Sequence, residues 1–334
     1  MRVKENGLAR AALAIARGAF YMGRMKLLRR AVSALLALLI ASPAAAAPAL
    51  WKFGDADTTI YLFGTIHALP PGYAWEDERI RKAMDSSDTL VIETLVDKDP
   101  RAMAALFPPP DPSLPPILER VKPEARPAFE ALLAKAKLDP AVLSRMPTWQ
   151  ASFVLMGAMM RDLGVQREAG VEDGLTSAFA PPASSDAPLT GDKASTLPSA
   201  SAAKTIEGLE TVADQLAMFS TLSEADQREM LTSFATGKSD AKADYDRLLT
   251  AWSSGDEAGI AKQFDEDKDL TPHLREILLR KRNANWAAWL KQRLDRPGTV
   301  FVAVGAGHLA GPLSVQKMLS ADGIAVERVE PSSR

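Results

Sequence analysis

The sequence contains no cysteine among its 334 residues. This absence excludes disulfide bonds, zinc fingers, iron–sulfur clusters and thiol catalysis together. Histidine is scarce as well, with only three residues, so a site that needs imidazole has very few candidates. A charge bias is also missing, because 40 Lys and Arg against 42 Asp and Glu give a formal charge of -2. The composition therefore gives no indication of a nucleic-acid partner.

Long apolar runs are confined to the region near the N-terminus. From Met25 a basic segment leads into an apolar stretch, Ala31 to Ile40, and then into small residues that end near Ala47. This order is typical of a secretory signal peptide, and the apolar stretch is about half of the roughly 20 residues that a membrane-spanning helix needs. We therefore expect residues 1–47 to be a signal peptide with an extended or misassigned start.

Removal of this segment changes the charge of the protein. Residues 1–47 hold eight basic residues and one acidic residue, which leaves 32 basic and 41 acidic residues and a formal charge of -9. An acidic, cysteine-free mature chain fits the periplasm or the exterior of a bacterium. The expected localisation is periplasmic or secreted, without stable membrane insertion after signal cleavage.

Short apolar runs alternate with helical spacing in the rest of the chain, which predicts an α/β fold. We expect a central mixed, largely parallel sheet with flanking helices, in one domain over residues 48–330. A hairpin pattern covers residues 50–63, and a large helical middle section contains a short strand at 204–209 and a flexible insertion at 180–203. Two strand-helix-strand units are expected, with segments 59–63, 76–85 and 89–92 in the first and 299–304, 312–320 and 324–329 in the second.

The chemistry-bearing residues gather at the ends of predicted strands. His67 and His308 each come three residues after a glycine that ends an apolar strand, in a G-x-x-H pattern, while Glu93 and Glu210 end two further strands. Ligands and catalytic groups collect at strand carboxyl ends in α/β sheets. Two imidazoles with one or two carboxylates would bind a divalent transition metal and leave positions for water and substrate. We therefore expect a metal site formed by His67, His308, Glu93 and Glu210.

Other interpretations of single residues stay open. A histidine after a strand can be a hydrogen-bonded turn residue, and a strand-end glutamate can be a helix cap or an ion-pair partner. Arg282 could clamp an anion in the cleft, or it could lie on the basic face of an amphipathic helix. We expect His273, in the first turn of a helix, to be solvated. Residues 305–310 satisfy a loose dinucleotide-binding pattern, but too few residues follow for a Rossmann domain.

Several segments of the sequence match one known pattern. They are W-K-F-G and T-I-Y-L-F-G-T-I-H up to His67, V-I-E-T at Glu93, G-L-E-T at Glu210 with Gln215 beyond it, R-N-x-x-W at Arg282, Asn283 and Trp286, and V-G-A-G-H up to His308. In these segments the chain resembles the TraB/GumN family, which includes the pheromone-shutdown protein PrgY and is related to the Tiki metalloproteases. The similarity extends from about Leu50 to Val329.

The resemblance implies a metal-dependent hydrolase fold. His67 and His308 would then be metal ligands or groups next to the metal, and Glu93 a ligand or general base. The Tiki branch is associated with peptide cleavage that uses a manganese- or cobalt-type ion. A G-[IV]-D motif of the family is similar to Gly170-Val171-Glu172-Asp173 here, and whether Glu172 or Asp173 matches its acidic residue is open.

The leading hypothesis is an exported metal-dependent hydrolase of the peptidase kind. Glu93 and Arg282 would be catalytic, the substrate a peptide or small molecule, and the cofactor a divalent manganese, cobalt, zinc or iron ion. The alternative is a non-enzymatic periplasmic protein that binds haem or a peptide with the same histidines. A third hypothesis is a structural accessory of the cell envelope with a vestigial cleft.

Overall fold

The structure is a computed structural model that describes residues 47–96, 99–180, 204–237, 241–267 and 270–331. Residues 47–330 form one compact unit. The expected signal peptide lies outside the described residues apart from Ala47, and so does the expected insertion apart from Ala180. In the described ranges, no helix has the length and apolar character needed to cross a membrane.

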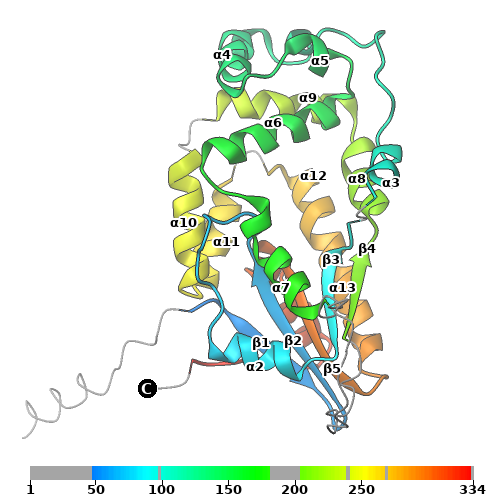
Figure 1. Ribbon diagram of the computed structural model, residues 1–334, viewed down its shortest axis with the longest axis vertical. Coiled ribbons are helices and arrows are strands. Elements are labelled where there is room, and N and C mark those ends of the chain that lie inside the picture. The colour runs from blue at the N-terminus through cyan, green and yellow to red at the C-terminus, as the bar shows by residue number, and fades with distance from the viewer. Residues whose placement is uncertain (1–46, 97–98, 181–203, 238–240, 268–269, 332–334) are drawn as a thin grey trace, which may run out of the picture. The chain divides into compact units, whose positions relative to one another are not determined.

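Within the described part of the chain, six strands form one mixed sheet in the order β4-β3-β5-β2-β1-β6 (Figure 1). The pairs β2 with β5, β3 with β5 and β3 with β4 are parallel, whereas β1 is antiparallel to both β2 and β6. The four parallel strands therefore end at the same edge of the sheet. The strand bounds are β1 Leu50–Gly54, β2 Thr58–Thr65, β3 Thr89–Thr94, β4 Thr205–Glu210, β5 Gly298–Gly305 and β6 Glu327–Arg328.

The strand topology confirms an α/β architecture with a mixed sheet and refines its details. In the first expected unit, β2 and β3 run in the same direction with helix α2 between them in sequence, but β5 separates them in the sheet. The last strand is shorter than the expected 324–329, because only Glu327 and Arg328 pair with β1. The helix expected from residue 312 begins at Val315, since Gly311 (φ 73°) turns the chain before it.

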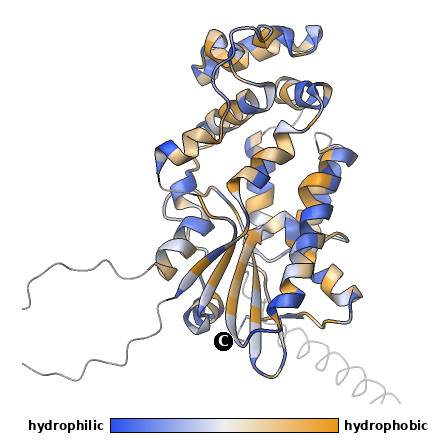
Figure 2. Ribbon diagram, turned by 90° about the vertical axis from the view of Figure 1, so that its right-hand side faces the viewer, coloured by the Kyte–Doolittle hydropathy of each residue, from blue (hydrophilic) through white to orange (hydrophobic). Residues whose placement is uncertain are grey.

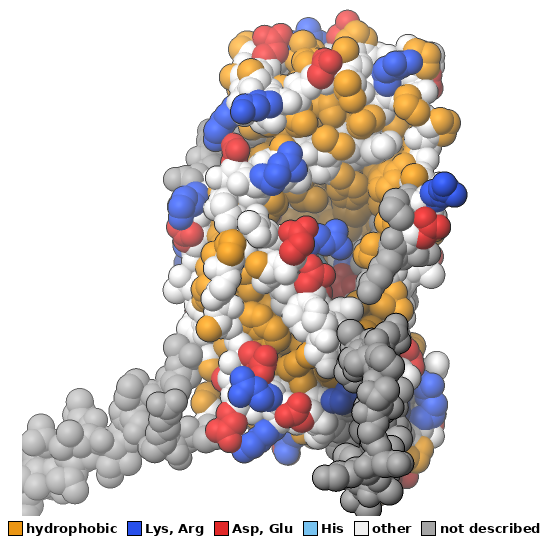
Figure 3. Space-filling model, viewed as in Figure 1, with side chains coloured by type: hydrophobic (Ala, Val, Ile, Leu, Met, Phe, Trp, Pro, Cys, Tyr) orange, Lys and Arg blue, Asp and Glu red, His pale blue; other side chains and the backbone are white. Residues whose placement is uncertain are grey.

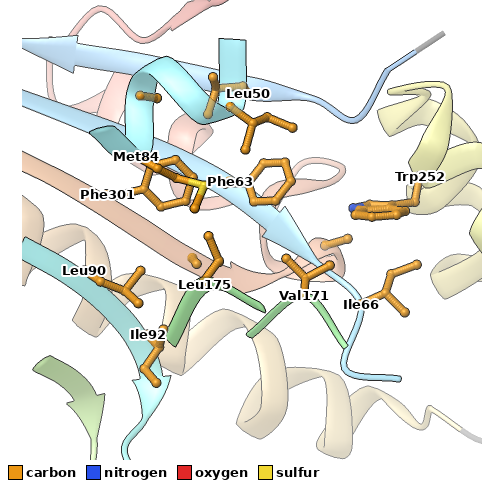
Figure 4. Packing of buried hydrophobic residues seen from close by; sticks show 14 of the residues in the cluster. Leu50, Phe63, Ile66, Met84, Leu90, Ile92, Val171, Leu175, Trp252 and Phe301 are labelled. Carbon is orange, nitrogen blue, oxygen red and sulfur yellow. The ribbon is translucent and has the colours of Figure 1, made fainter. Parts of the chain in front are cut away.

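Alternating strand residues build a hydrophobic core on each face of the sheet. Along β5, Phe301 and Ala303 contact one core, whereas Val300, Val302 and Val304 contact the other. This period of two is what a buried strand requires. Figure 2 shows the resulting apolar strands. On the first face, Phe63 and Phe301 pack with Leu175 and Met84 (Figure 4), and the ring centroids of the two phenylalanines are 5.9 Å apart.

Helices cover both faces of the sheet. Helices α2 Glu78–Ser86, α7 Val171–Phe179, α10 Ala241–Ser253 and α11 Glu257–Glu266 supply side chains to the core that contains Phe63. The opposite core receives side chains from α13 Arg282–Arg293 and α14 Val315–Ala321. A short helix α12, Pro272–Arg275, and a π-helical segment η4, Glu276–Lys281, lead directly into α13. Segments of π-helix occur frequently at functional sites.

The middle of the chain forms a helical section that has a third hydrophobic core. Leu133, Leu155 and Leu231 come from three of its helices and are almost fully buried there. Figure 1 shows this section at the carboxyl-terminal side of the parallel strands. Its helices and neighbours are α3 Pro100–Ala105, α4 Arg126–Ala136, α5 Pro140–Ser144, α6 Thr148–Asp162, α8 Val212–Ser220 and α9 Glu224–Thr236.

Candidate functional site

The fold brings the predicted residues to the edge where the parallel strands end. Glu93 is the second-to-last residue of β3, and Glu210 is the last residue of β4. His67 follows β2 by two residues. His308 lies in a short 3-10 helix, η5 Ala306–Leu309, directly after β5. The third histidine, His273, is exposed in α12, as the sequence predicts.

Arg282, the first residue of α13, connects three of these side chains. Its Nη2 donates to Glu93 Oε2 at 2.7 Å and to Glu210 Oε2 at 2.8 Å, and its Nη1 donates to His308 Nε2 at 3.1 Å. The side chains of Arg282, Glu93 and Glu210 are only 10–11% exposed. The interpretation of Arg282 as part of a solvated basic face is therefore wrong, because the guanidinium is the centre of a buried ion cluster.

Glu210 is held almost entirely by α13. Arg282 Nε lies 3.0 Å from each oxygen of this carboxylate, and the indole Nε1 of Trp286 donates to Oε1 at 3.1 Å. Arg282 and Trp286 are one helical turn apart, so both side chains project from the same face of α13. Gln215 Nε2 lies 3.4 Å from Glu210 Oε2 and 3.4 Å from Glu93 Oε2, and so bridges the two carboxylates.

His308 is oriented by Asn283. The amide Nδ2 of Asn283 donates to the carbonyl oxygens of Leu313, at 2.7 Å, and His308, at 3.3 Å. This fixes Oδ1 toward His308 Nδ1, 2.6 Å away, so Nδ1 carries the proton and Nε2 is an acceptor. Burial lowers the pKa of His308 to about 3, and the Arg282 cation acts in the same direction. The ring is therefore neutral near pH 7, with the lone pair of Nε2 directed at Arg282.

His67 is oriented in the same way by Glu172. Its Nδ1 donates to Glu172 Oε1 at 2.6 Å, and Thr65 Oγ1 donates to the same oxygen at 2.5 Å. The hydrogen bond to Glu172 raises the pKa of His67 despite partial burial. Burial alone would raise the pKa of Glu172, but the hydrogen bonds from His67 and Thr65 lower it. The His67 side chain is 68% exposed, so Nε2 is the ring nitrogen available to a ligand.

The backbone around His67 is fixed from three directions. Trp252 Nε1 donates to the carbonyl of Gly64 at 2.7 Å, and Tyr245 Oη donates to that of Ala68 at 2.8 Å. The chain that begins α7 approaches so closely that a Cβ on Gly170 would lie 2.2 Å from the carbonyl oxygen of His67. Glycine at position 170 is therefore what lets Glu172 reach the imidazole.

Glu172, and not Asp173, is the acidic residue that belongs to the site. We expect Glu172→Gln to lower the pKa of His67 in the metal-free protein, because the charge that favours the imidazolium is removed. Asp173→Asn is the matched control, since Asp173 is the next residue in α7 and is exposed. NMR titration of the His67 ring measures both. An equal effect of the two substitutions would contradict the assigned contact.

Gly305 provides the space at which the donors converge. Its N–H donates to Glu93 Oε1 at 2.7 Å. A Cβ at this position would lie 3.2 Å from Glu93 Oε1, 3.6 Å from His308 Cδ2 and 3.7 Å from His67 Nε2. Side chains from three different strand ends therefore border one small space that glycine leaves open.

We expect Gly305→Ala to retain the fold and impair the site. The backbone of Gly305 (φ -50°, ψ 137°) is open to alanine, but the methyl group would occupy the space between the donors. Ligand binding at this space should weaken about tenfold or more, while the free energy of unfolding falls by about 1–3 kcal/mol. Gly157→Ala in α6, where a Cβ has room, is the control. Calorimetry and binding assays on both variants test this, and undiminished binding by Gly305→Ala would contradict it.

The electrostatics keep Glu93 ionised. Burial by itself raises the pKa of this carboxyl, but the Arg282 cation and the Gly305 N–H favour the charged form, and the pKa falls to about 2. For Arg282, burial opposes the cation, but contacts with Glu210 and Glu93 raise its pKa. The cluster therefore contains two carboxylates and one guanidinium, with a net negative charge that favours cations.

The donor set fits a divalent transition metal in kind. Both imidazoles have Nδ1 bound to a side-chain oxygen, which is the usual arrangement of histidine ligands that coordinate through Nε2. Glu93 Oε1 lies 3.7 Å from His308 Nε2. Nevertheless, among the described residues no group of three or more His, Cys, Asp or Glu side chains is close enough together to hold a metal ion. In this structure Arg282 contacts both His308 Nε2 and Glu93 Oε2.

Exposed apolar side chains follow β3 and also lie on α6. Leu95 and Val96 directly follow Thr94, the last residue of β3, and are 45% and 47% exposed. On α6, Met156 and Met160 are one turn apart and also exposed. The space-filling view in Figure 3 shows a hollow whose walls carry many hydrophobic side chains, with charged side chains at its rim. Such surface is suited to apolar groups of a ligand.

Comparison with known proteins gives one family. The model of the TraB/PrgY/gumN family matches residues 49–328. The chain is similar to the uncharacterized protein YbaP of Escherichia coli strain K12, with 24% identity over 262 residues, which cover 78% of this chain and 87% of YbaP. YbaP of Shigella flexneri matches with the same identity and coverage. No solved structure matches significantly.

Proposed function

Because this chain belongs to the TraB/PrgY/gumN family, we propose that it is an exported metal-dependent hydrolase that cleaves peptides. One observation carries the proposal: two histidines, each held at Nδ1 by a side-chain oxygen, border the space at Gly305 together with Glu93. Export is supported by the basic, apolar and small-residue pattern of residues 1–47. The TraB/GumN resemblance supports the reaction class.

In this proposal, His67 Nε2, His308 Nε2 and Glu93 hold the ion. A bound manganese, cobalt, zinc or iron ion would lower the pKa of a water molecule and polarise the peptide carbonyl. Glu172 and Asn283 occupy the two Nδ1 atoms, so that Nε2 of each ring is the nitrogen directed at the ion. Glu210 holds Arg282 and is not among the ligands, although the sequence pattern includes it in the ligand set.

Glu93 has a second role in the proposal, as the acceptor of the water proton. Its Oε2 faces Arg282 and Gln215, whereas Oε1 is bound by the Gly305 N–H. While Arg282 remains in contact, the pKa of Glu93 is too low for an effective general base. Movement of the guanidinium away from Oε2 would free this oxygen to accept the proton of the water molecule.

Hydrolysis of a peptide library tests the proposal. With metal supplied, the purified protein should cleave peptides, and His67→Ala and His308→Ala should each lose cleavage while remaining folded. His273→Ala is a matched control because it removes the remaining, exposed histidine. Cleavage that persists in both site variants would contradict the proposal.

A second candidate function is ligand binding without catalysis. The observation that favours it is the 68% exposed His67 side chain, which could bind haem iron, together with exposed Leu95 and Val96. Haem titration distinguishes this function: a Soret band that disappears in His67→Ala would support it. If no Soret shift occurs, haem is excluded as the ligand.

A further inference from the structure

We infer that Arg282 is a built-in competitor of the metal ion, which closes the site in the metal-free protein and pivots on Glu210 to open it. The inference rests on the proposed function, because it concerns the same donors. It assigns Arg282 to control of metal affinity, and Glu210 with Trp286 to holding Arg282 in the open state.

Arg282 competes with a metal ion for His308. Arg282 Nη1 donates to Nε2 at 3.1 Å, and Asn283 already occupies Nδ1. A neutral imidazole has one ring lone pair, and a transition metal needs it at a distance of about 2.0–2.1 Å. The guanidinium and an ion therefore cannot use His308 at the same time.

Arg282 also competes with a metal ion for Glu93. Arg282 Nη2 donates to Oε2 at 2.7 Å, and both side chains are about nine-tenths buried. A guanidinium in such surroundings satisfies a carboxylate that would otherwise attract a divalent ion. The energy needed to separate this pair is subtracted from the energy of metal binding, so Arg282 lowers the metal affinity.

Arg282 has partners that would remain if it left His308 and Glu93. The edge formed by Nε and Nη2 already contacts Glu210 at 3.0, 3.0 and 2.8 Å. Trp286 binds the same carboxylate and places its ring 4.6 Å from the guanidinium carbon. Arg282 can therefore release His308 and Glu93 and keep a bidentate partner and a cation–π contact. Gln215 Nε2 is placed to replace it at Glu93 Oε2.

Equilibrium dialysis against Mn²⁺, with elemental analysis of the bound ion, tests the inference. Arg282→Met should bind Mn²⁺ about tenfold or more tightly than the wild-type protein, because the competing cation is removed. Arg282→Lys keeps the charge but reaches fewer partners, so its affinity for Mn²⁺ should lie between those of Arg282→Met and the wild-type protein. This variant also tests the inference if Arg282→Met fails to fold. Arg280→Met is the control, since Arg280 lies two residues earlier and its partner Glu276 is outside the cluster.

Chemical rescue separates competition from a general charge effect. In Arg282→Ala, added methylguanidinium should weaken Mn²⁺ binding again, whereas tetramethylammonium at equal ionic strength should not, because it has no N–H groups for His308 and Glu93. Neither salt should act specifically on the wild-type protein. Lack of a methylguanidinium effect would overturn the inference.

The outcomes also separate the inference from the proposed function. If the wild-type protein binds Mn²⁺ and the Arg282 variants bind no better, the inference is overturned and the proposed function stands. If the variants bind one ion per chain and the wild-type protein binds it less tightly, the inference is supported. If no form binds Mn²⁺, cobalt, zinc or iron, both are overturned.

Discussion

Replacement of Glu93 by glutamine is expected to reduce peptide hydrolysis by about 10²- to 10⁴-fold, the usual contribution of a general acid–base group. Glutamine has nearly the same shape, and its carbonyl oxygen can still accept from the Gly305 N–H. Its amide group cannot accept from Arg282 or take a proton from water. Loss of activity in this variant therefore reports the carboxylate itself.

The same substitution should also weaken metal binding and folding. The new amide would direct its N–H groups at Arg282 Nη2, which leaves buried donors facing each other and costs about 1–3 kcal/mol. Glu207→Gln is the matched control, because Glu207 lies on the neighbouring strand β4 and is exposed. Kinetics with saturating metal, together with thermal unfolding, measure both effects. Wild-type turnover in Glu93→Gln would exclude Glu93 from the chemistry.

Arg282→Met is expected to lower the free energy of unfolding of the metal-free protein by about 3–5 kcal/mol. The substitution leaves Glu93 and Glu210 buried without their cation, and removal of one partner from a buried ion cluster has costs of this size. Part of the loss should return in the double variant with Glu210→Gln, because one of the two uncompensated charges is then absent.

Arg280→Met provides the comparison for this stability effect. Arg280 also pairs with a carboxylate, that of Glu276, but the pair lies on the surface of the π-helical segment. Surface pairs contribute little, so the control should unfold almost as the wild-type protein does. Denaturant unfolding without divalent ions measures all four proteins. Equal stability of Arg282→Met and the wild-type protein would contradict a buried, charged cluster.

The main strands could be predicted from the sequence because the spacing of apolar residues that marks a strand is local. The alternation in residues 50–63 predicts the hairpin of β1 and β2, and the apolar run at 299–304 predicts β5. Strand order depends on contacts between distant segments, which explains why the insertion of β5 between β2 and β3 had no local signal. The short β6 follows from pairing with β1 and also could not be located from its own residues.

The site was predictable in part for the same reason. Strand-end positions select His67, His308, Glu93 and Glu210, and the structure brings three of them, Glu93, Glu210 and His308, into contact with Arg282. The orienting groups come from helices whose packing the sequence does not specify.

Two of these orienting groups were difficult to identify from the sequence. Asn283 is adjacent to Arg282 in the R-N-x-x-W segment, which was the available signal for it. Glu172 could not be distinguished from Asp173 by sequence, because the choice depends on which face of α7 meets His67.

Metal content tests the central claim most directly. The protein from Ala47 onward, purified without chelators and reconstituted with manganese, cobalt, zinc or iron, should contain one ion per chain by elemental analysis. The His67→Ala/His308→Ala double variant should contain none, although it remains folded. A wild-type protein without metal after reconstitution, or a double variant that binds as much as the wild-type protein, would contradict the account.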